Sequence, residues 1–291
     1  MGLPGRDFKL AMNNPIMKSE QRQPDNKAEN AHKTMLAAFQ FEQFSISLSE
    51  YDVGIKQNWH SHEEPILALI LAGHTREQVG NQDIVASPLD IGLKPANLSH
   101  TDHFCPNGVR VVRVSLAASL FTELGHTSQT LERWDWIRGS DAVRPLLQAA
   151  DKLRRNNSCN TQIKEDVYES LASLLPAKQK RLAADAPGWL RQALECLQES
   201  YASGVRLSEL AEQVGVHPVY FARQFRRFYG CSVGQYVRQL QFRDASTLLA
   251  NQKNSLAQIA YKVGCADQAH LTRLFADGFG ITPARFRKIV T

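Results

Sequence analysis

The sequence predicts a multidomain α+β protein with an N-terminal β-barrel, a helical linker and a C-terminal all-α domain that contains two helix-turn-helix units. Three observations support this fold class: short strand-like runs before residue 116, helical periodicity after it, and a segment near the end of the chain that recurs about 50 residues later. A chain of 291 residues is long enough for two domains, each with its own core.

The N-terminal half divides into an arm and a strand region. Residues 1–34 are polar, contain three prolines and show no periodicity, which is typical of a flexible arm. From residue 35 to 116, runs such as FEQFSISLSEY and ILALILAG alternate with Gly, Pro, Asn and Asp. Short strands broken by turn residues are typical of a small barrel or sandwich. We therefore expect residues 35–116 to form a small β-barrel or sandwich.

Residues 117–185 have the periodicity of helices. The segments DAVRPLLQAADKLRRN and TQIKEDVYESLASLL place apolar residues at i, i+3, i+4 and i+7. We expect this region to form a homodimer and to be followed by a linker at 176–187. An apolar stripe on its second helix favours packing within the chain over contact with a partner. That stripe consists of Ile163, Val167, Leu171 and Leu174.

Charge is distributed unevenly along the chain. Residues 186–291 hold 13 Lys and Arg against 7 Asp and Glu, whereas residues 1–185 hold 21 against 22. A basic segment beside a neutral one indicates a nucleic-acid-binding module, and an acidic lipid surface is the alternative. No apolar run reaches the roughly 18–20 residues that span a bilayer, and we see no signal peptide, so we expect a cytoplasmic protein. The five scattered cysteines suit reduced thiols.

The first copy of the repeat reads LSELAEQVGVHPVYFARQFRRFYG. Ala211 is small enough for two helices to cross, Gly215 fits a turn with positive φ, and Pro218 suits the first position of the second helix. In a helix-turn-helix, the second helix enters the major groove, where Arg can pair bidentately with guanine. We expect the buried face of this helix to be Phe221, Phe225 and Phe228, and its outward face to be Val219, Ala222, Arg223 and Arg226.

The second copy reads SLAQIAYKVGCADQAHLTRLFADGFG and repeats the design with Ala260 at the crossing and Gly264 in the turn. Asp267 is a good N-cap. The helix between the copies, about 20 residues or about 30 Å long, suits two recognition helices in major grooves about 34 Å apart. With a better cap and more polar readers, the second unit is expected to discriminate bases, and the first to anchor phosphates with one Arg contact. The expected outward residues are Gln268, Ala269, Thr272 and Arg273, with His270 as a further candidate for this face.

These residues carry a family resemblance. Residues 187–289 resemble the DNA-binding domain of the AraC/XylS family of transcriptional regulators, most specifically in GCADQAHLTRLFADGFGITPARFRK. The departures are Cys265 for Phe, Leu271 for an aromatic, His217 for a Ser cap, which predicts a weaker helix start, and Gln241 for Arg. The resemblance implies a transcription regulator, more often an activator, with RNA polymerase as a further partner. It places the base-contacting positions at Val219, Ala222, Arg223, Gln268, Ala269 and Arg273.

The strand region resembles a cupin-like sensor domain. GIKQNWHSHEEPILALILAG and PANLSH begin as the two cupin motifs do, and they supply His60, His62 and His100. In a strand His60 and His62 share a face, and His100 can approach from the facing hairpin. Three imidazoles can hold Zn²⁺, Fe²⁺ or Mn²⁺. The position of the usual carboxylate ligand is Ile66, although Glu63, Glu64 and His103 are near in sequence.

The sequence therefore predicts a sequence-specific regulator that binds double-stranded DNA and is controlled by an effector, not an enzyme. The barrel is expected to bind a small molecule without metal. One alternative is a metal-assisted sensor, with His60, His62 and His100 as ligands of a divalent metal. Another is a metal-dependent cupin enzyme fused to a DNA-binding domain, and a third is a structural DNA-bending protein.

Overall fold

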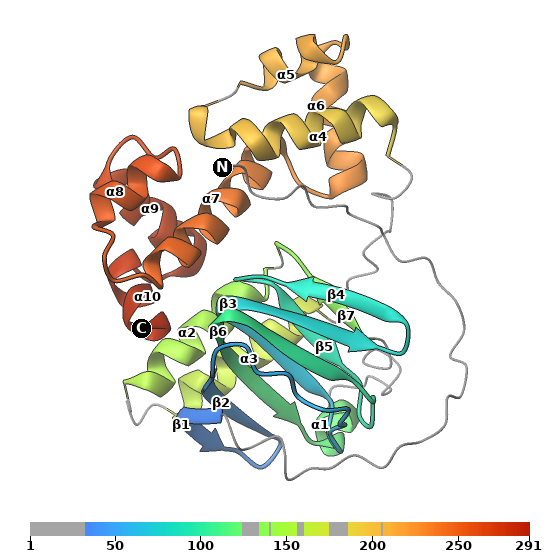
Figure 1. Cartoon of the computed structure of the whole chain (residues 1–291), viewed down its shortest axis with the longest axis vertical. Coiled ribbons are helices and arrows are strands. Elements are labelled where there is room, and N and C mark those ends of the chain that lie inside the picture. Colours follow the sequence, from blue (N-terminus) through green and yellow to red (C-terminus); the bar gives the residue numbers. More distant parts are fainter. Residues whose placement is uncertain (1–32, 124–133, 140, 156–159, 175–185, 205) are drawn as a thin grey trace.

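The computed structural model describes residues 33–123, 134–139, 141–155, 160–174, 186–204 and 206–291 (Figure 1). The expected arm at 1–34 lies outside the described residues except for its last two, which belong to the first strand. Most of the expected linker at 176–187 also lies outside them. The described chain forms a strand-rich N-terminal domain and a helical C-terminal domain, as the sequence predicts.

The N-terminal domain is an antiparallel sheet that rolls over on itself. Within the described residues its strands follow the order β1-β2-β6-β3-β5-β7, and β4 pairs with the far end of β3. Buried apolar residues alternate along β2, which packs one face on the core. The strands are β1 (Lys33–Gln40), β2 (Phe44–Tyr51), β3 (Ile66–Val79), β4 (Gln82–Ala86), β5 (Ile91–Lys94), β6 (Thr101–Leu116) and β7 (Asp135–Ile137).

Strands β3 and β6 run through both layers of the roll and bend together at two glycines. Gly73 and Gly108 both have positive φ, and a Cβ on Gly73 would lie 1.9 Å from the carbonyl oxygen of Gly108. Only glycine permits this close approach. Beyond the bend, the first part of β6 pairs with the end of β3 and is bridged at His100 to His60. The bend therefore creates a second layer that carries the histidines.

Two expected boundaries differ from the structure. Strand β1 begins at Lys33, so the barrel starts inside the expected arm. Strand β7 lies within 117–185, which the sequence assigned to helices, and pairs with β5. A three-residue strand is too short to show a period of two, which is why the pattern missed it.

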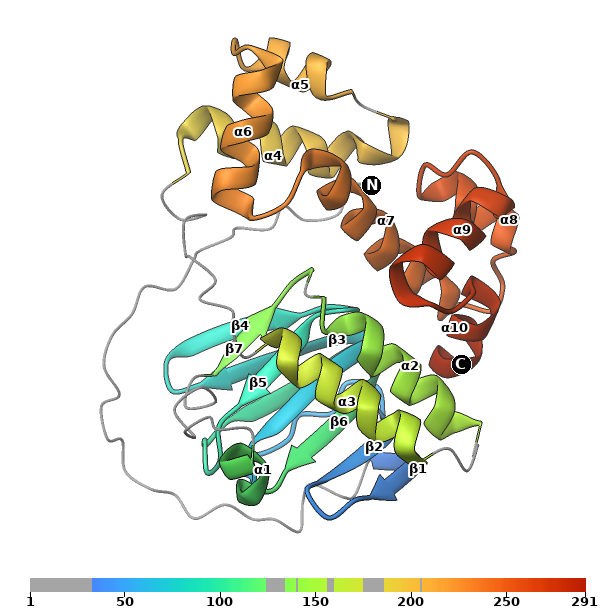
Figure 2. The ribbon, with the colours of Figure 1, turned by 180° about the vertical axis from the view of Figure 1, so that it is seen from behind.

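Helices α2 (Val143–Arg154) and α3 (Asn160–Leu174) from the middle region cover one face of the sheet (Figure 2). The apolar stripe of α3 is buried in the same core cluster as Phe44 and Leu69. Its residues therefore pack within the chain, the outcome that the stripe favoured. The helices are α1 (Ala118–Glu123), α2 (Val143–Arg154) and α3 (Asn160–Leu174).

The C-terminal domain contains two three-helix groups joined by α7. This connecting helix has 17 residues, so it is about 25 Å long, shorter than the expected 30 Å. The helices are α4 (Gly188–Ser200), the 3-10 helix η4 (Tyr201–Ser203), α5 (Leu207–Gln213), α6 (Pro218–Tyr229), α7 (Val233–Leu249), α8 (Leu256–Lys262), α9 (Gln268–Phe279) and α10 (Pro283–Val290).

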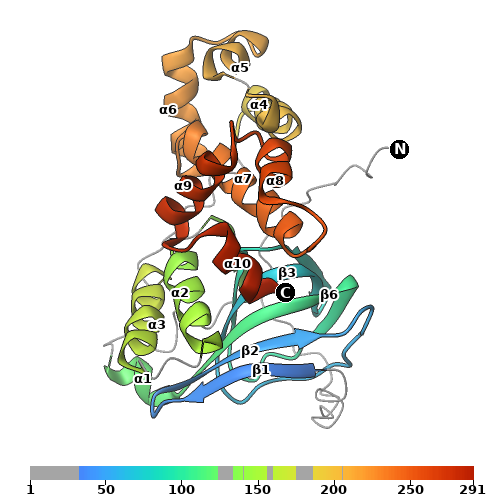
Figure 3. The same cartoon turned by 90° about the vertical axis from the view of Figure 1, so that its left-hand side faces the viewer.

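The two groups have different cores. Helices α4, α5 and α6 enclose a separate cluster around Phe221 and Phe225. Helices α8, α9 and α10 contribute Ile259, Phe275 and Phe286, respectively, to the large cluster that also includes residues of the sheet and α2. Figures 1 and 3 show α10 beside α2 and the ends of β3 and β6, while α5 stands away from the sheet. Among the described residues, no helix is both long enough and apolar enough to cross a membrane.

Candidate nucleic-acid interface and effector site

The first recognition helix, α6, begins with a functioning cap. The His217 Nδ1 atom accepts a hydrogen bond of 3.3 Å from the backbone N–H of Val219, and Pro218 occupies the first helical position. Histidine thus replaces serine as the acceptor over a long distance, and the weaker helix start expected from the sequence stays a prediction. The supporting helix α5 buries Ala211 completely against its neighbours.

The outward face of α6 is as predicted in most positions. Val219 is 71% exposed, Arg223 and Arg226 are exposed, and Ala222 is half-buried. Phe221 and Phe225 are fully buried, but the predicted Phe228 is only half-buried.

Tyr220, an exposed aromatic residue of this helix, was not identified from the sequence. Tyr220 is 42% exposed, and the Arg223 guanidinium lies 5.7 Å from the centre of its ring. A cation over an aromatic face at this distance is attracted to it. Tyr220 therefore belongs to the same surface as the predicted readers, and its place three residues before Arg223 was the signal that could have found it.

The second recognition helix, α9, has a stronger cap. The Asp267 carboxylate accepts a hydrogen bond of 2.6 Å from the N–H of His270, and the His270 ring in turn accepts one from the N–H of Ala266. His270, the further candidate for the outward face, is half-buried, and its ring supports the turn. Two donors at the start of α9 are thus satisfied by side chains.

The predicted readers of α9 share an open face. Gln268, Ala269 and Arg273 are exposed. Thr272 is half-buried, and its hydroxyl donates to the carbonyl of Gln268 at 2.9 Å. Its hydroxyl proton is therefore engaged within the helix, which leaves the oxygen as an acceptor.

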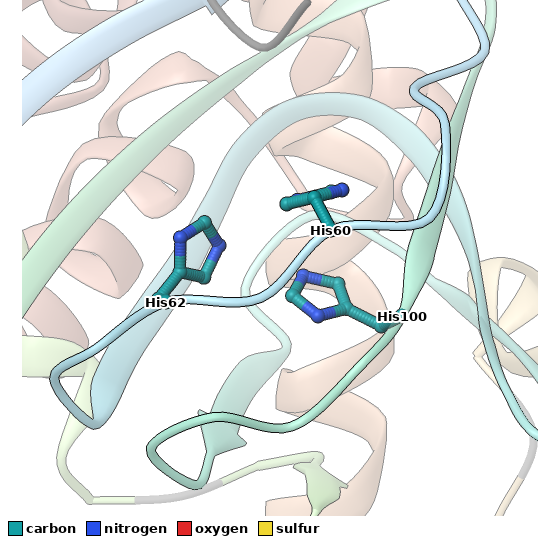
Figure 4. Close-up of side chains that lie close together, drawn as sticks. All are labelled: His60, His62 and His100. Atoms are coloured by element: carbon teal, nitrogen blue, oxygen red, sulfur yellow. The ribbon is translucent and has the colours of Figure 1, made fainter. Parts of the chain in front are cut away.

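The three predicted histidines of the sheet domain meet in space (Figure 4). The ring of His60 lies 4.3 Å from that of His100, and the His62 ring lies 5.1 Å from each. One ring nitrogen of each residue lies within 4.8 Å of the others. His60 and His100 are held together by an isolated antiparallel bridge rather than by a continuous strand.

Backbone carbonyls fix the protonation of two of these rings. The Nδ1 atoms of His60 and His100 lie 2.8 and 2.9 Å from the carbonyl oxygens of Asn58 and Leu98. Because a carbonyl only accepts, each Nδ1 carries the proton and each Nε2 keeps a lone pair. Both Nε2 atoms are buried without a hydrogen-bond partner among the described residues. Burial, followed by the Lys94 charge, lowers the pKa of His100 to about 3, so the ring is neutral at physiological pH.

The third ring is engaged differently. The Nε2 atom of His62 lies 3.2 Å from an Arg113 guanidinium nitrogen, which donates to it. Burial, and then the Arg113 charge, lower the pKa of His62 far below its usual value. His62 is therefore a neutral acceptor whose lone pair already has a partner.

Three charged residues beside the cluster were missed by the sequence analysis. The Lys94 ammonium lies 2.9 Å from Glu77 Oε1 and 3.3 Å from Asp102 Oδ2, all three being buried. The His100 Nε2 atom lies 3.6 Å from Asp102, too far for a good hydrogen bond. By contrast, the acidic or basic neighbours expected from sequence do not join the cluster, because Glu63, Glu64 and His103 are all exposed.

A cavity of about 30 Å³ adjoins this charged group. Lys94, Asp102 and Arg113 line the cavity and also lie beside the histidines. Its other lining residues include Tyr51, Gln57 and Trp136. A space of this size holds roughly two water molecules. The cavity and the charged residues that line it thus offer a site for a small ligand.

Comparisons with known proteins agree with the geometry of the C-terminal domain. Residues 210–289 match a family described as a helix-turn-helix domain. PqrA of Proteus vulgaris, described as a probable transcription factor, is 34% identical over 85 residues, which cover 29% of this chain and 70% of PqrA. The transcriptional activator RhaS of Yersinia pestis is 30% identical over 124 residues, 42% of this chain and 45% of RhaS.

The wider comparisons are more distant. The crystal structure of ToxT from Vibrio cholerae aligns with 86% of this chain and 99% of ToxT, at 11% identity and a TM-score of 0.37. Across the matched curated relatives, the alignments span between 36% and 70% of the relative's own length. The two helix-turn-helix units, together with the match to PqrA, show that the chain belongs to the AraC/XylS family of DNA-binding transcription regulators.

Proposed function

We propose that this regulator is controlled by an effector that binds at the histidine cluster and the adjoining cavity of the sheet domain. The observation that carries the proposal is the pair of buried Nε2 lone pairs on His60 and His100, for which the described part of the chain offers no hydrogen-bond partner. An unsatisfied buried acceptor costs roughly 1–3 kcal/mol, so a ligand that supplies the missing partner is strongly favoured.

A divalent metal ion fits these residues best. Imidazoles whose Nδ1–H groups donate to backbone carbonyls present their Nε2 lone pairs as metal ligands do. His60 and His100 would hold the ion, and His62 would join if Arg113 released it. The ion would supply a positive charge that ties the His60 segment to the start of β6. Lys94 and Arg113 oppose that charge, while Glu77 and Asp102 offset it.

The size of the cavity also favours a small effector. Pockets for organic ligands are typically roughly 300–1,000 Å³, ten times or more the volume found here. An organic effector, which the sequence analysis preferred, would require the sheet to open around it. A metal ion or another small ion requires no such change.

Control of transcription is proposed to follow from a population shift. The effector must bind one arrangement of the two domains more tightly than the other, because equal affinity would shift nothing. The family and the name of RhaS support activation as the sign of the effect. We further propose action in the cytoplasm as a homodimer, with RNA polymerase as a contact at the promoter.

Metal analysis tests the effector site. Purified protein loaded with Zn²⁺ or Mn²⁺ and then dialysed should retain about one ion per chain, and His60→Ala or His100→Ala should lose it. His103→Ala is the matched control, because this exposed histidine lies only three residues after His100, in β6. Absence of bound metal in the unmutated protein would exclude the metal proposal and leave the organic effector.

The DNA contacts are proposed to come from Arg223, Gln268 and Arg273, with phosphates held by Arg226. A duplex selected from a random library by the intact protein is the probe. Arg273→Ala should weaken specific binding by about tenfold or more, since one bidentate contact discriminates by about 1–3 kcal/mol. Affinity should also fall steeply with salt, because neutralised phosphates release counterions. An unchanged footprint for Arg273→Ala would contradict this assignment.

A further inference from the structure

Strand β6 presents different chemistry on its two faces. Val109, Val111 and Arg113 line the cavity. Arg110 lies between them in sequence, and because side chains alternate along a strand, it points to the opposite side. There it is 8% exposed, and its Nη2 atom lies 2.6 Å from the Glu50 carboxylate of β2. A buried guanidinium costs free energy unless its donors are satisfied, so its remaining contacts are informative.

Those contacts belong to the DNA-binding domain. Arg110 donates to the carbonyl oxygens of Ile289 at 3.2 Å and Thr291 at 3.4 Å. Ile289 lies in the last turn of α10, where carbonyls have no partner within the helix and the helix dipole is negative. A positive charge from the sheet domain thus holds the end of α10.

The held helix supports the second recognition helix. Phe286 of α10 is fully buried, and its ring centre lies 5.6 Å from that of Phe275 in α9. The far end of α9 is also tied to α2, because Arg144 donates to the carbonyl of Asp277 and Gln148 to that of Phe279. The sheet domain therefore fixes the C-terminal end of α9, while the N-terminal end, with Gln268 and Ala269, stays exposed.

We propose that Arg110 is a positioning residue for DNA recognition: through α10, it holds the second recognition helix at a set distance and angle from the first. The contact orients the reading surface and does not cover it. The two units are joined by α7 and by the packing of Gly264 beside Ala202, and the junction at Arg110 adds a constraint from the sheet domain on the position of the second unit. This inference rests on DNA binding alone and needs no effector, so its failure is distinguishable from failure of the effector proposal.

The spacing of the DNA site provides the test. The probes are the library-selected duplex and a second duplex with two base pairs inserted between its two protected segments. The unmutated protein should bind the second duplex much more weakly. In Arg110→Met, affinity for the first duplex should fall about tenfold, within the usual range of coupling between domains. The ratio of its affinities for the first and second duplexes should fall by a similar factor. Footprint protection should weaken first at the segment that α9 reads.

Three further variants separate positioning from loss of fold. Arg76→Met removes an exposed Arg of the sheet domain whose ion pair, with Asp83, lies within a hairpin, and it should bind both duplexes as the unmutated protein does. Arg110→Lys keeps the charge and should restore part of the spacing penalty. If Arg110→Met does not fold, the double change Arg144→Ala and Gln148→Ala removes the parallel ties from α2. A folded variant with an unchanged spacing penalty overturns the proposal, as does an equal loss in Arg76→Met.

Discussion

The two helix-turn-helix units share a design but not a setting. Each has a buried alanine at the helix crossing and a glycine with positive φ in the turn. The first unit encloses its own small core, whereas the second is built into the core of the sheet domain. Figure 1 shows the same contrast, with α5 and α6 standing apart and α10 lying against the sheet. A repeated motif can therefore occur once with its own core and once with a core shared with another domain.

The turn glycines should show the largest difference between the units. A Cβ on Gly215 would meet nothing within 4 Å, but one on Gly264 would lie 2.6 Å from the carbonyl oxygen of Ala202. Gly215→Ala should lower the free energy of unfolding by about 1 kcal/mol, the cost of its left-handed φ. Gly264→Ala should lower it by about 3 kcal/mol, because the clash adds to the same strain.

Urea denaturation of the two glycine variants measures this difference. Gly215→Ala is the matched control, because its φ of +68° is close to the +73° of Gly264. Equal losses in the two variants would show that the turn of the second unit can shift away from η4.

Acid should loosen the second unit before the first. His100 has a folded-state pKa of about 3, below the ordinary value of 6.5, so the unfolded chain takes up the proton first. Its stabilisation is complete above pH 6.5 and is lost as pH falls from 6.5 towards 3. At pH 5.5 the loss is about 1.4 kcal/mol. Since the second unit shares the core of the sheet domain, the backbone amides of this unit should lose hydrogen-exchange protection as this stability is lost.

Hydrogen exchange at pH 7.5 and 5.5, corrected for intrinsic rates, follows the two units separately. Protection in α9 and α10 should fall more than protection in α5 and α6. In His100→Gln, the acid-dependent part of the change should shrink. A parallel fall in both units of the unmutated protein would contradict the division into separate cores.

The helix caps should show the smallest difference. Asp267 accepts from His270 N–H at 2.6 Å, whereas His217 accepts from Val219 N–H at 3.3 Å. Asp267→Ala should lower the free energy of unfolding by about 1 kcal/mol, and His217→Ala by less than about half of that. Thermal denaturation of the two variants compares them, and a larger loss for His217→Ala would reverse the predicted ranking.

Much of both sites could be predicted from local patterns. The repeat located both recognition helices and their exposed residues, because a helix-turn-helix is defined by short spacings of small, turn and apolar residues. The two cupin-like motifs likewise predicted that His60, His62 and His100 lie close together, because each motif is defined by short spacings along the chain. Glu77 and Asp102 could not be found in this way. They are cross-strand partners in the register of β3 and β6, and nothing local in the sequence fixes that register.

The sequence by itself determined two helical reading units, a strand-rich domain with a histidine cluster, and a basic C-terminal third. These properties depend on residue type and spacing over a few helical turns or strands. Only the tertiary structure decided which unit is anchored, since Arg110 and Ile289 are 179 residues apart along the chain and meet through folding. The contact between a buried guanidinium and a helix end depends on how two domains pack, and no periodicity encodes it.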